Sequence, residues 1–113
     1  MRHALSGLRV LFAAERNARF EGIMGVLAVI AGIILHLDWV RWCVLLALCC
    51  LVLATEAINT AIERAVDLTV GHELHPLAKQ AKDIAAAAVL FIALLAVIVA
   101  VWLFGPALAK IFF

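Results

Sequence analysis

The feature that most limits the fold of this chain is an unbroken apolar run of 21 residues, Ile84 to Phe104. About 20 apolar residues in a helix are enough to cross a bilayer, because each residue adds about 1.5 Å to a core about 30 Å thick. The chain is also 68% hydrophobic and 15% charged, with a mean hydropathy of +1.19. Soluble domains are much more polar than this. The sequence therefore predicts an all-α integral membrane protein with a transmembrane helix at 84–104.

Two further apolar segments predict two more transmembrane helices. The first, 22–37, contains 14 consecutive apolar residues and is followed by tryptophans that suit a membrane interface. The second begins at residue 40, and its helical pattern continues past the apolar part to about residue 70. Gly71 is a natural helix stop there. We expect spans at 22–37, 40–70 and 84–104, with a polar connector before the last one.

The first twenty residues predict an amphipathic helix at the membrane surface. Its apolar residues recur at helical spacing, and its arginines fall largely on other faces. Two acids, Glu15 and Glu21, lie in or next to this segment. A signal peptide would not carry such acids, so we expect that the segment is not cleaved off. The surface helix 1–20 and the three spans would then form one membrane-embedded domain, residues 1–113.

Basic residues are distributed unevenly around the three predicted spans. The N-terminal stretch and the second connector hold seven of them, against two on the other side. The seven are Arg2, Arg9, Arg16, Arg19, Arg64, Lys79 and Lys82, and the two are Arg41 and Lys110. Basic loops stay in the cytoplasm, so the N-terminus and the second connector are expected there.

An acidic stripe runs along the polar continuation of the second span. Glu56, Asn59, Glu63 and Asp67 fall within an arc of roughly 80°, because spacings of three and four return to one helix face. Glu56 lies only two residues beyond the apolar run, where an ionisable group is costly unless it has a partner or a task. A solvated helix face accounts for Asp67, whereas Glu56 favours a function.

The predicted topology brings this stripe to the same membrane surface as Glu15, Arg19 and Glu21. Carboxylates that share a site repel one another, which indicates either a bound divalent cation or a network of ion pairs. Oxygen ligands favour magnesium, which proteins usually hold with one or two carboxylates together with substrate phosphates. Magnesium-bound ATP fits this pattern.

Several other chemistries are not supported. A net charge of +1 and the absence of a Lys/Arg run give no basis for nucleic-acid binding. The three cysteines lie in one apolar segment and are expected to pack, and His72 and His75 lack a third zinc ligand at the usual spacing. The chain has neither a Gly-x4-Gly-Lys-Ser/Thr loop nor protein-kinase motifs.

Three segments carry a family resemblance: ERNARFEG at 15–22, EAINTAIERAVD at 56–67 and HPLAKQAKD at 75–83. They resemble the prokaryotic diacylglycerol kinases, small three-span enzymes that include the undecaprenol kinases, and the match runs nearly end to end. The resemblance implies a homotrimeric bundle in the bacterial inner membrane, with active sites shared between subunits at the cytoplasmic face. It also implies transfer of the ATP γ-phosphate to the hydroxyl of a membrane lipid.

The resemblance further implies roles for single residues. Glu56 corresponds to the general base, and Asn59 and Asp83 complete the implied catalytic set. Glu15 and Glu63 correspond to the ligands of Mg²⁺. The implied nucleotide contacts are Glu15, Glu63, Asp67, Glu73, His75, Lys82 and Asp83. The implied lipid contacts are Arg9, Arg19, Glu21 and Glu56.

The first and last motifs resemble the undecaprenol kinase branch more than the diacylglycerol kinase branch. The resemblance therefore leaves diacylglycerol and undecaprenol as the expected lipid alcohols and favours undecaprenol. The N-terminal region is shorter than in the enterobacterial members, and the connector has one extra residue near Gly71, so residues 1–4 are not expected to contact nucleotide. Two other functions remain open. An ion-coupled carrier would place acids near the bilayer midplane, where these spans are apolar, and a helper subunit would not need the acidic stripe.

Overall fold

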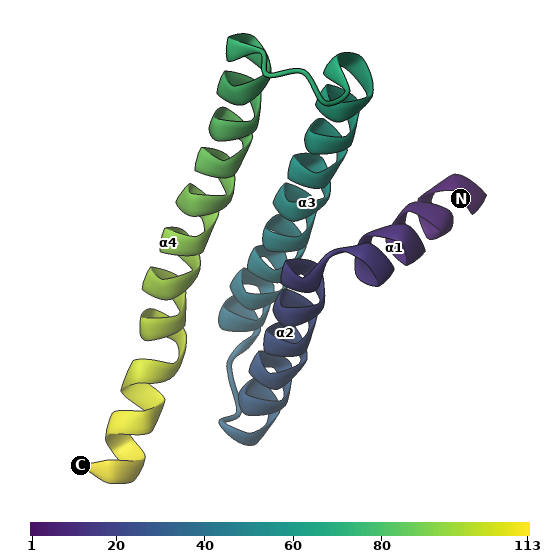
Figure 1. The fold of residues 1–113 in the computed structure, drawn as a ribbon. Helices are drawn as coiled ribbons and strands as arrows, with labels where there is room; N and C mark the ends of the chain where they lie inside the picture. Colours follow the sequence, from purple (N-terminus) through teal and green to yellow (C-terminus); the bar gives the residue numbers. More distant parts are fainter.

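The protein is all-helical in a computed structural model that describes residues 1–113. It contains four helices: α1 (Arg2–Ala14), α2 (Arg16–Ile34), α3 (Trp39–Val70) and α4 (Pro76–Phe112). The last three lie side by side with alternating direction, and α1 leaves the group at an angle from the start of α2 (Figure 1). Each of α2, α3 and α4 is long and apolar enough to cross a membrane. The predicted all-α class is confirmed, and three helices have the length and composition of the predicted membrane spans.

The boundary between the first two helices differs from the prediction, which placed a surface helix at 1–20 and a span at 22–37. Helix α1 ends at Ala14 and α2 starts at Arg16, because Glu15 between them is extended, with φ −106° and ψ 114°. The Arg19 guanidinium donates hydrogen bonds to carbonyl oxygens in the last turn of α1, which have no partner within the helix. Residues 16–20 therefore belong to α2, the helix of the first candidate span.

Helix α2 ends earlier than predicted, in a motif that reverses the chain toward α3. The N–H of Leu37 donates to the Gly32 carbonyl and that of His36 to the Ile33 carbonyl, with His36 at φ 54°. These are the two hydrogen bonds of a Schellman motif, and they satisfy carbonyls at the helix end. Asp38 then caps α3, and the hydrogen bond it accepts from the Arg41 backbone N–H is the main cause that lowers the pKa of its carboxyl.

Helix α3 ends at Val70, and Gly71 follows at φ 60°, in agreement with the predicted stop. Helix α4 begins at Pro76, eight residues before the predicted span at 84–104. Proline suits a helix start, because it lacks only an N–H that would be unpaired there, and the His75 side chain accepts from the Leu77 N–H at 3.1 Å. The predicted polar connector is therefore shorter, and its last part forms the first turns of α4.

The far end of α4 also differs from the prediction. The helix does not stop at Gly105-Pro106 but continues to Phe112. Proline removes one hydrogen bond from a helix, and membrane helices tolerate this because neighbouring groups satisfy the freed carbonyl. On α3, the Arg41 guanidinium lies 4.9 Å from the centre of the Trp102 ring of α4 and links the two helices at this end.

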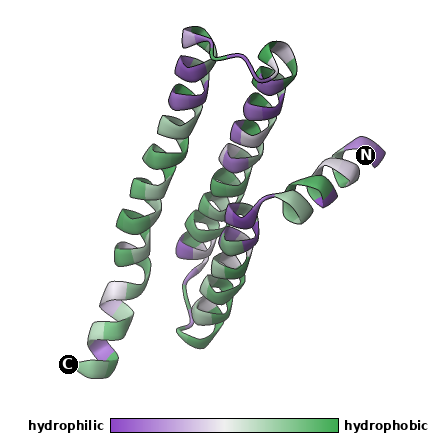
Figure 2. Ribbon diagram, in the orientation of Figure 1, coloured by the Kyte–Doolittle hydropathy of each residue, from purple (hydrophilic) through white to green (hydrophobic).

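Most apolar side chains of the isolated chain are exposed. Only 8 of 113 residues are buried, so the chain has almost no core of its own and its apolar surface requires lipid or other subunits. Figure 2 shows hydrophobic residues along the middle of α2, α3 and α4. Hydrophilic residues gather where α2 begins, where α3 ends and where α4 begins. The polar end of the molecule is where the candidate site residues lie.

Candidate active site

Four carboxylates from separate parts of the chain meet beside the polar half of α3. Glu56 is only 3% exposed, and its charge interacts with those of Glu15 and Glu63 and with that of Glu21. Glu15 comes from the break between α1 and α2, Glu21 from α2, and the other two from α3. We call these four residues the acidic cluster. Because their charges repel one another, the cluster favours binding of a cation.

Asn59 and Thr60 lie on α3 within the acidic cluster's sequence span. The Asn59 Nδ2 donates to Oε1 of Glu63 at 3.3 Å, which fixes one oxygen of that carboxylate. Thr60 is buried and its hydroxyl has no partner, whereas Thr55 and Thr69 donate to carbonyls of their own helix. Thr60 is not among the predicted site residues, although its position four residues after Glu56 places it next to that side chain on the helix face.

Four buried polar atoms at this level have no hydrogen-bond partner in the isolated chain. They are Oε2 of Glu21, Oε2 of Glu56, Oδ1 of Asn59 and Oγ1 of Thr60. An unpaired buried polar group costs about 1–3 kcal/mol, so native structures contain few of them. Their concentration in one place indicates that a ligand or a neighbouring subunit supplies the missing partners.

Three of the predicted nucleotide contacts near the connector take part in two surface ion pairs. Lys82 of α4 reaches Asp67 of α3, with 2.5 Å between Nζ and Oδ1. Asp83 pairs with Lys79 on its own helix, with 2.6 Å between Oδ2 and Nζ. Glu73 is exposed in the connector that precedes α4. His75, the N-cap residue of α4, is exposed as well. The structure thus brings Asp67 and Lys82 together, while Asp83 faces a different cation.

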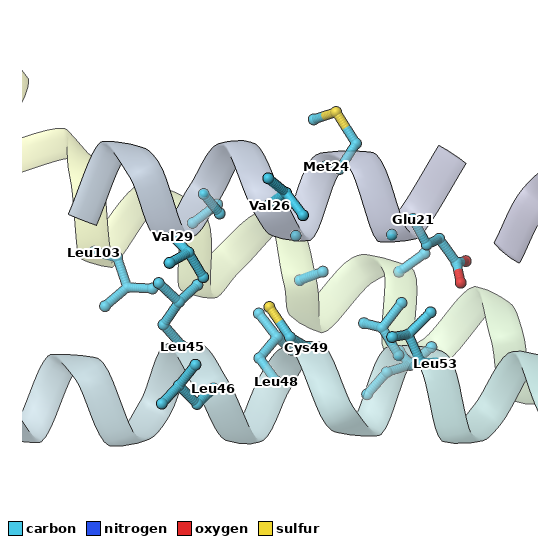
Figure 3. Close-up of a pocket in the computed structure, with 18 of the residues that line it drawn as sticks. Glu21, Met24, Val26, Val29, Leu45, Leu46, Leu48, Cys49, Leu53 and Leu103 are labelled. Carbon is cyan, nitrogen blue, oxygen red and sulfur yellow. The ribbon is translucent and has the colours of Figure 1, made fainter. Parts of the chain in front are cut away.

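The predicted lipid contacts are not grouped in one place. Arg9 is exposed on α1, Arg19 is occupied by carbonyl oxygens of α1, and only Glu21 and Glu56 belong to the acidic cluster. Glu21 also lines a cavity of about 710 Å³ between α2, α3 and α4. Figure 3 shows Glu21 at one end of this cavity and Leu103 toward the other. Of its 23 lining residues 20 are hydrophobic, so the cavity suits an apolar chain with a polar end group.

The acidic cluster is not a complete metal site in the isolated chain. No three His, Cys, Asp or Glu side chains converge closely enough to hold a metal ion. None of the four carboxylates forms an ion pair, which leaves their oxygens available as ligands. One or two carboxylates are what proteins usually supply to magnesium when phosphate oxygens complete the coordination. The residues therefore fit a cation that arrives with a phosphate-bearing ligand.

Comparisons with known proteins agree with the family resemblance. The Prokaryotic diacylglycerol kinase profile matches residues 2–104. The chain is 46% identical over 110 residues to a diacylglycerol kinase of Synechocystis sp., covering 97% of this chain and 63% of the relative. It thus spans less than two thirds of that relative's length.

Two further relatives are covered over most of their length. The chain is 36% identical over 106 residues to the undecaprenol kinase of Bacillus subtilis, covering 94% of this chain and 85% of the relative. It is 38% identical over 96 residues to the diacylglycerol kinase of Escherichia coli, covering 85% of this chain and 78% of the relative. The chain therefore belongs to the prokaryotic diacylglycerol kinase family.

Proposed function

We propose that this protein is a lipid kinase that transfers the γ-phosphate of ATP to the hydroxyl of a membrane lipid alcohol. The observation that carries the proposal is the Glu56 carboxylate, which is buried, has an unpartnered oxygen and lies among three other acids. The similarity of the chain to proteins named diacylglycerol kinase and undecaprenol kinase supports the same conclusion. Neither an ion-coupled carrier nor a helper subunit is favoured by this family membership.

In this proposal Glu56 is the general base. A lipid hydroxyl is a poor nucleophile until a positioned group accepts its proton. Glu56 lies where the apolar part of α3 meets its polar part, which is the depth at which the hydroxyl of a membrane lipid lies. The hydroxyl oxygen attacks the γ-phosphorus, the bond to the β-phosphate oxygen breaks, and the proton passes to Glu56. The products are a lipid phosphate and ADP.

Glu15 and Glu63 of the acidic cluster would bind ATP together with Asp67, Lys82 and Asp83. Glu15 and Glu63 would hold Mg²⁺, whose chemistry is to neutralise negative charge on phosphate oxygens. The Asn59 amide keeps one Glu63 oxygen in place. Lys82 would leave Asp67 to meet a phosphate, and Asp83 would contact the nucleotide beside it. Glu73 and His75, exposed at the connector, would border the nucleotide.

The apolar cavity would hold the lipid tail. Glu21 stands at one end of it (Figure 3). Because Glu21 also belongs to the acidic cluster, a lipid tail in the cavity would place its hydroxyl on the side of Glu56. Diacylglycerol and undecaprenol both have this arrangement of a hydroxyl on an apolar tail. We favour undecaprenol because the sequences of the first and last motifs resemble those of the undecaprenol kinases. Arg9 would meet the membrane surface near the lipid headgroup.

The functional form would be a homotrimer in the bacterial inner membrane, with sites shared between subunits. Two observations support association: the chain buries only 8 of its 113 residues, and four polar atoms of the site lack partners. The excess of Lys and Arg on the side of the acidic cluster supports its placement in the cytoplasm. Helix α1 would lie on that surface with its apolar side toward lipid, as part of a single domain 1–113.

The test is phosphate transfer from ATP to a panel of diacylglycerol and polyprenol acceptors in detergent micelles, with Glu56→Gln as the key variant. Gln keeps the size of the side chain and removes its basicity. Loss of the base is expected to lower turnover by roughly 10² to 10⁴, with thermal stability close to that of the unmodified protein. An active but unstable Glu56→Gln protein would refute the base assignment and leave Glu56 with a structural role.

A further inference from the structure

We infer that Arg19 is a positioning residue, which holds Glu15 in the acidic cluster by fixing the corner between α1 and α2. This inference rests on the proposed function, in which Glu15 serves as a ligand for magnesium-bound ATP. It assigns Arg19 a different task from the headgroup contact that the family resemblance implies.

The first observation is the hydrogen bonding of the Arg19 guanidinium. Its Nη1 donates to the carbonyl oxygens of Phe12 and Ala13, at 2.9 Å in each case. The last carbonyls of a helix have no partner within it, and a cation is favourable at this negative end of the helix dipole. Arg19 is therefore a C-terminal cap for α1 that is supplied by the next helix.

The second observation is that the backbone of Glu15 is held on both sides of the break. Its N–H donates to the Leu11 carbonyl at 2.9 Å, and its own carbonyl accepts from the Arg19 N–H at 3.2 Å. The Glu15 side chain makes no cap hydrogen bond to α2 and enters no ion pair. No hydrogen bond or ion pair of its own holds the carboxylate, so its position depends on the backbone of the corner.

The third observation is that the corner is packed on its inner side. Leu11 of α1 is 6% exposed and Ala18 of α2 is fully buried, and the two helices are in contact with each other. A Cβ at Gly22 would lie 3.3 Å from Cε1 of Phe12, which shows how closely that ring approaches α2. Apolar contacts are not directional, whereas the two hydrogen bonds of Arg19 fix the angle at which α1 leaves. Without them, only apolar packing would hold the angle between the two helices.

The experiment compares Arg19→Gln with Arg16→Gln, an exposed arginine one turn earlier that makes no side-chain hydrogen bond. Mn²⁺ is used as the probe, and its binding in the presence of a non-hydrolysable ATP analogue is followed by electron paramagnetic resonance. Arg19→Gln is expected to weaken Mn²⁺ binding about tenfold, the equivalent of one charged hydrogen bond. The KM for the lipid is expected to stay unchanged, and Arg16→Gln is expected to change neither quantity.

Two further measurements separate a positioning role from general damage. Hydrogen exchange of the amides in the last turn of α1 should become faster in Arg19→Gln and only slightly faster in Arg19→Lys, which keeps the charge. Combining Arg19→Gln with Glu15→Gln should weaken Mn²⁺ binding no more than Glu15→Gln alone, because both changes act on one ligand.

The outcomes distinguish this inference from the proposed function. A raised lipid KM with unchanged Mn²⁺ binding in Arg19→Gln would overturn the inference and return Arg19 to the headgroup. Additive effects of Arg19→Gln and Glu15→Gln would overturn it as well. If Glu15→Gln alone leaves Mn²⁺ binding intact, the metal assignment of the proposed function fails, and the inference fails with it. Should Arg19→Gln not fold, Arg19→Lys carries the same comparison with a smaller expected effect.

Discussion

Removal of the Lys82 cation tests whether this residue serves the fold or the chemistry. In the structure Lys82 bridges α4 to α3 through Asp67, so Lys82→Met removes both a surface ion pair and a cation that the proposed function assigns to ATP. The two roles predict losses of different size. Their magnitudes follow from the exposure of the pair and from what a phosphate contact contributes.

The ion pair contributes little to stability. The side chains of Lys82 and Asp67 are 40% and 60% exposed, and pairs this open contribute about 0.2–1 kcal/mol. A loss of 1 kcal/mol corresponds to a factor of about five. Removal of a positioned group that stabilises charge in a transition state instead costs roughly 10²–10³ in turnover. A structural Lys82 would therefore lower activity at most about fivefold, and a phosphate-binding Lys82 at least about a hundredfold.

The assay measures initial rates of phosphate transfer and unfolding of the same protein in the same micelles. Lys79→Met is the matched control, because Lys79 lies one turn earlier on α4 and also forms an exposed ion pair, with Asp83. We expect Lys82→Met to lose two to three orders of magnitude in turnover with little loss of stability, and Lys79→Met to lose a few-fold at most. Equal, small losses in both variants would refute the phosphate role of Lys82.

Two other expectations concern packing and assembly. Gly32→Ala should be less stable than Gly25→Ala by about 1–3 kcal/mol in reversible unfolding. A Cβ at Gly32 would lie 2.9 Å from Trp42 Cη2, whereas a Cβ at Gly25 would make only an ordinary contact at 3.7 Å. Equal stabilities of the two variants would contradict the close packing at Gly32. A mixture of Glu56→Gln subunits and Lys82→Ala subunits should regain activity if active sites are shared between subunits. If no activity returns although subunit exchange is confirmed, the result would count against shared sites.

Much of the fold follows from the sequence alone, because local patterns control it. The length of apolar runs determines which segments cross the membrane, since each span must satisfy its own backbone. Gly71 stops α3 because glycine adopts a positive φ without strain. The acidic stripe follows from helical periodicity on a single element, and the family is evident from three short motifs.

The tertiary structure decided what depends on contacts between elements. The break at Glu15 is not visible in the apolar pattern, since it depends on Arg19 reaching back to carbonyls of the previous helix. Helix α4 extends beyond its apolar run at both ends, because a helix needs only satisfied hydrogen bonds and not apolar residues. The influence of the Glu15 charge on Glu56 depends on how α2 packs against α3, and no spacing within either helix encodes this arrangement.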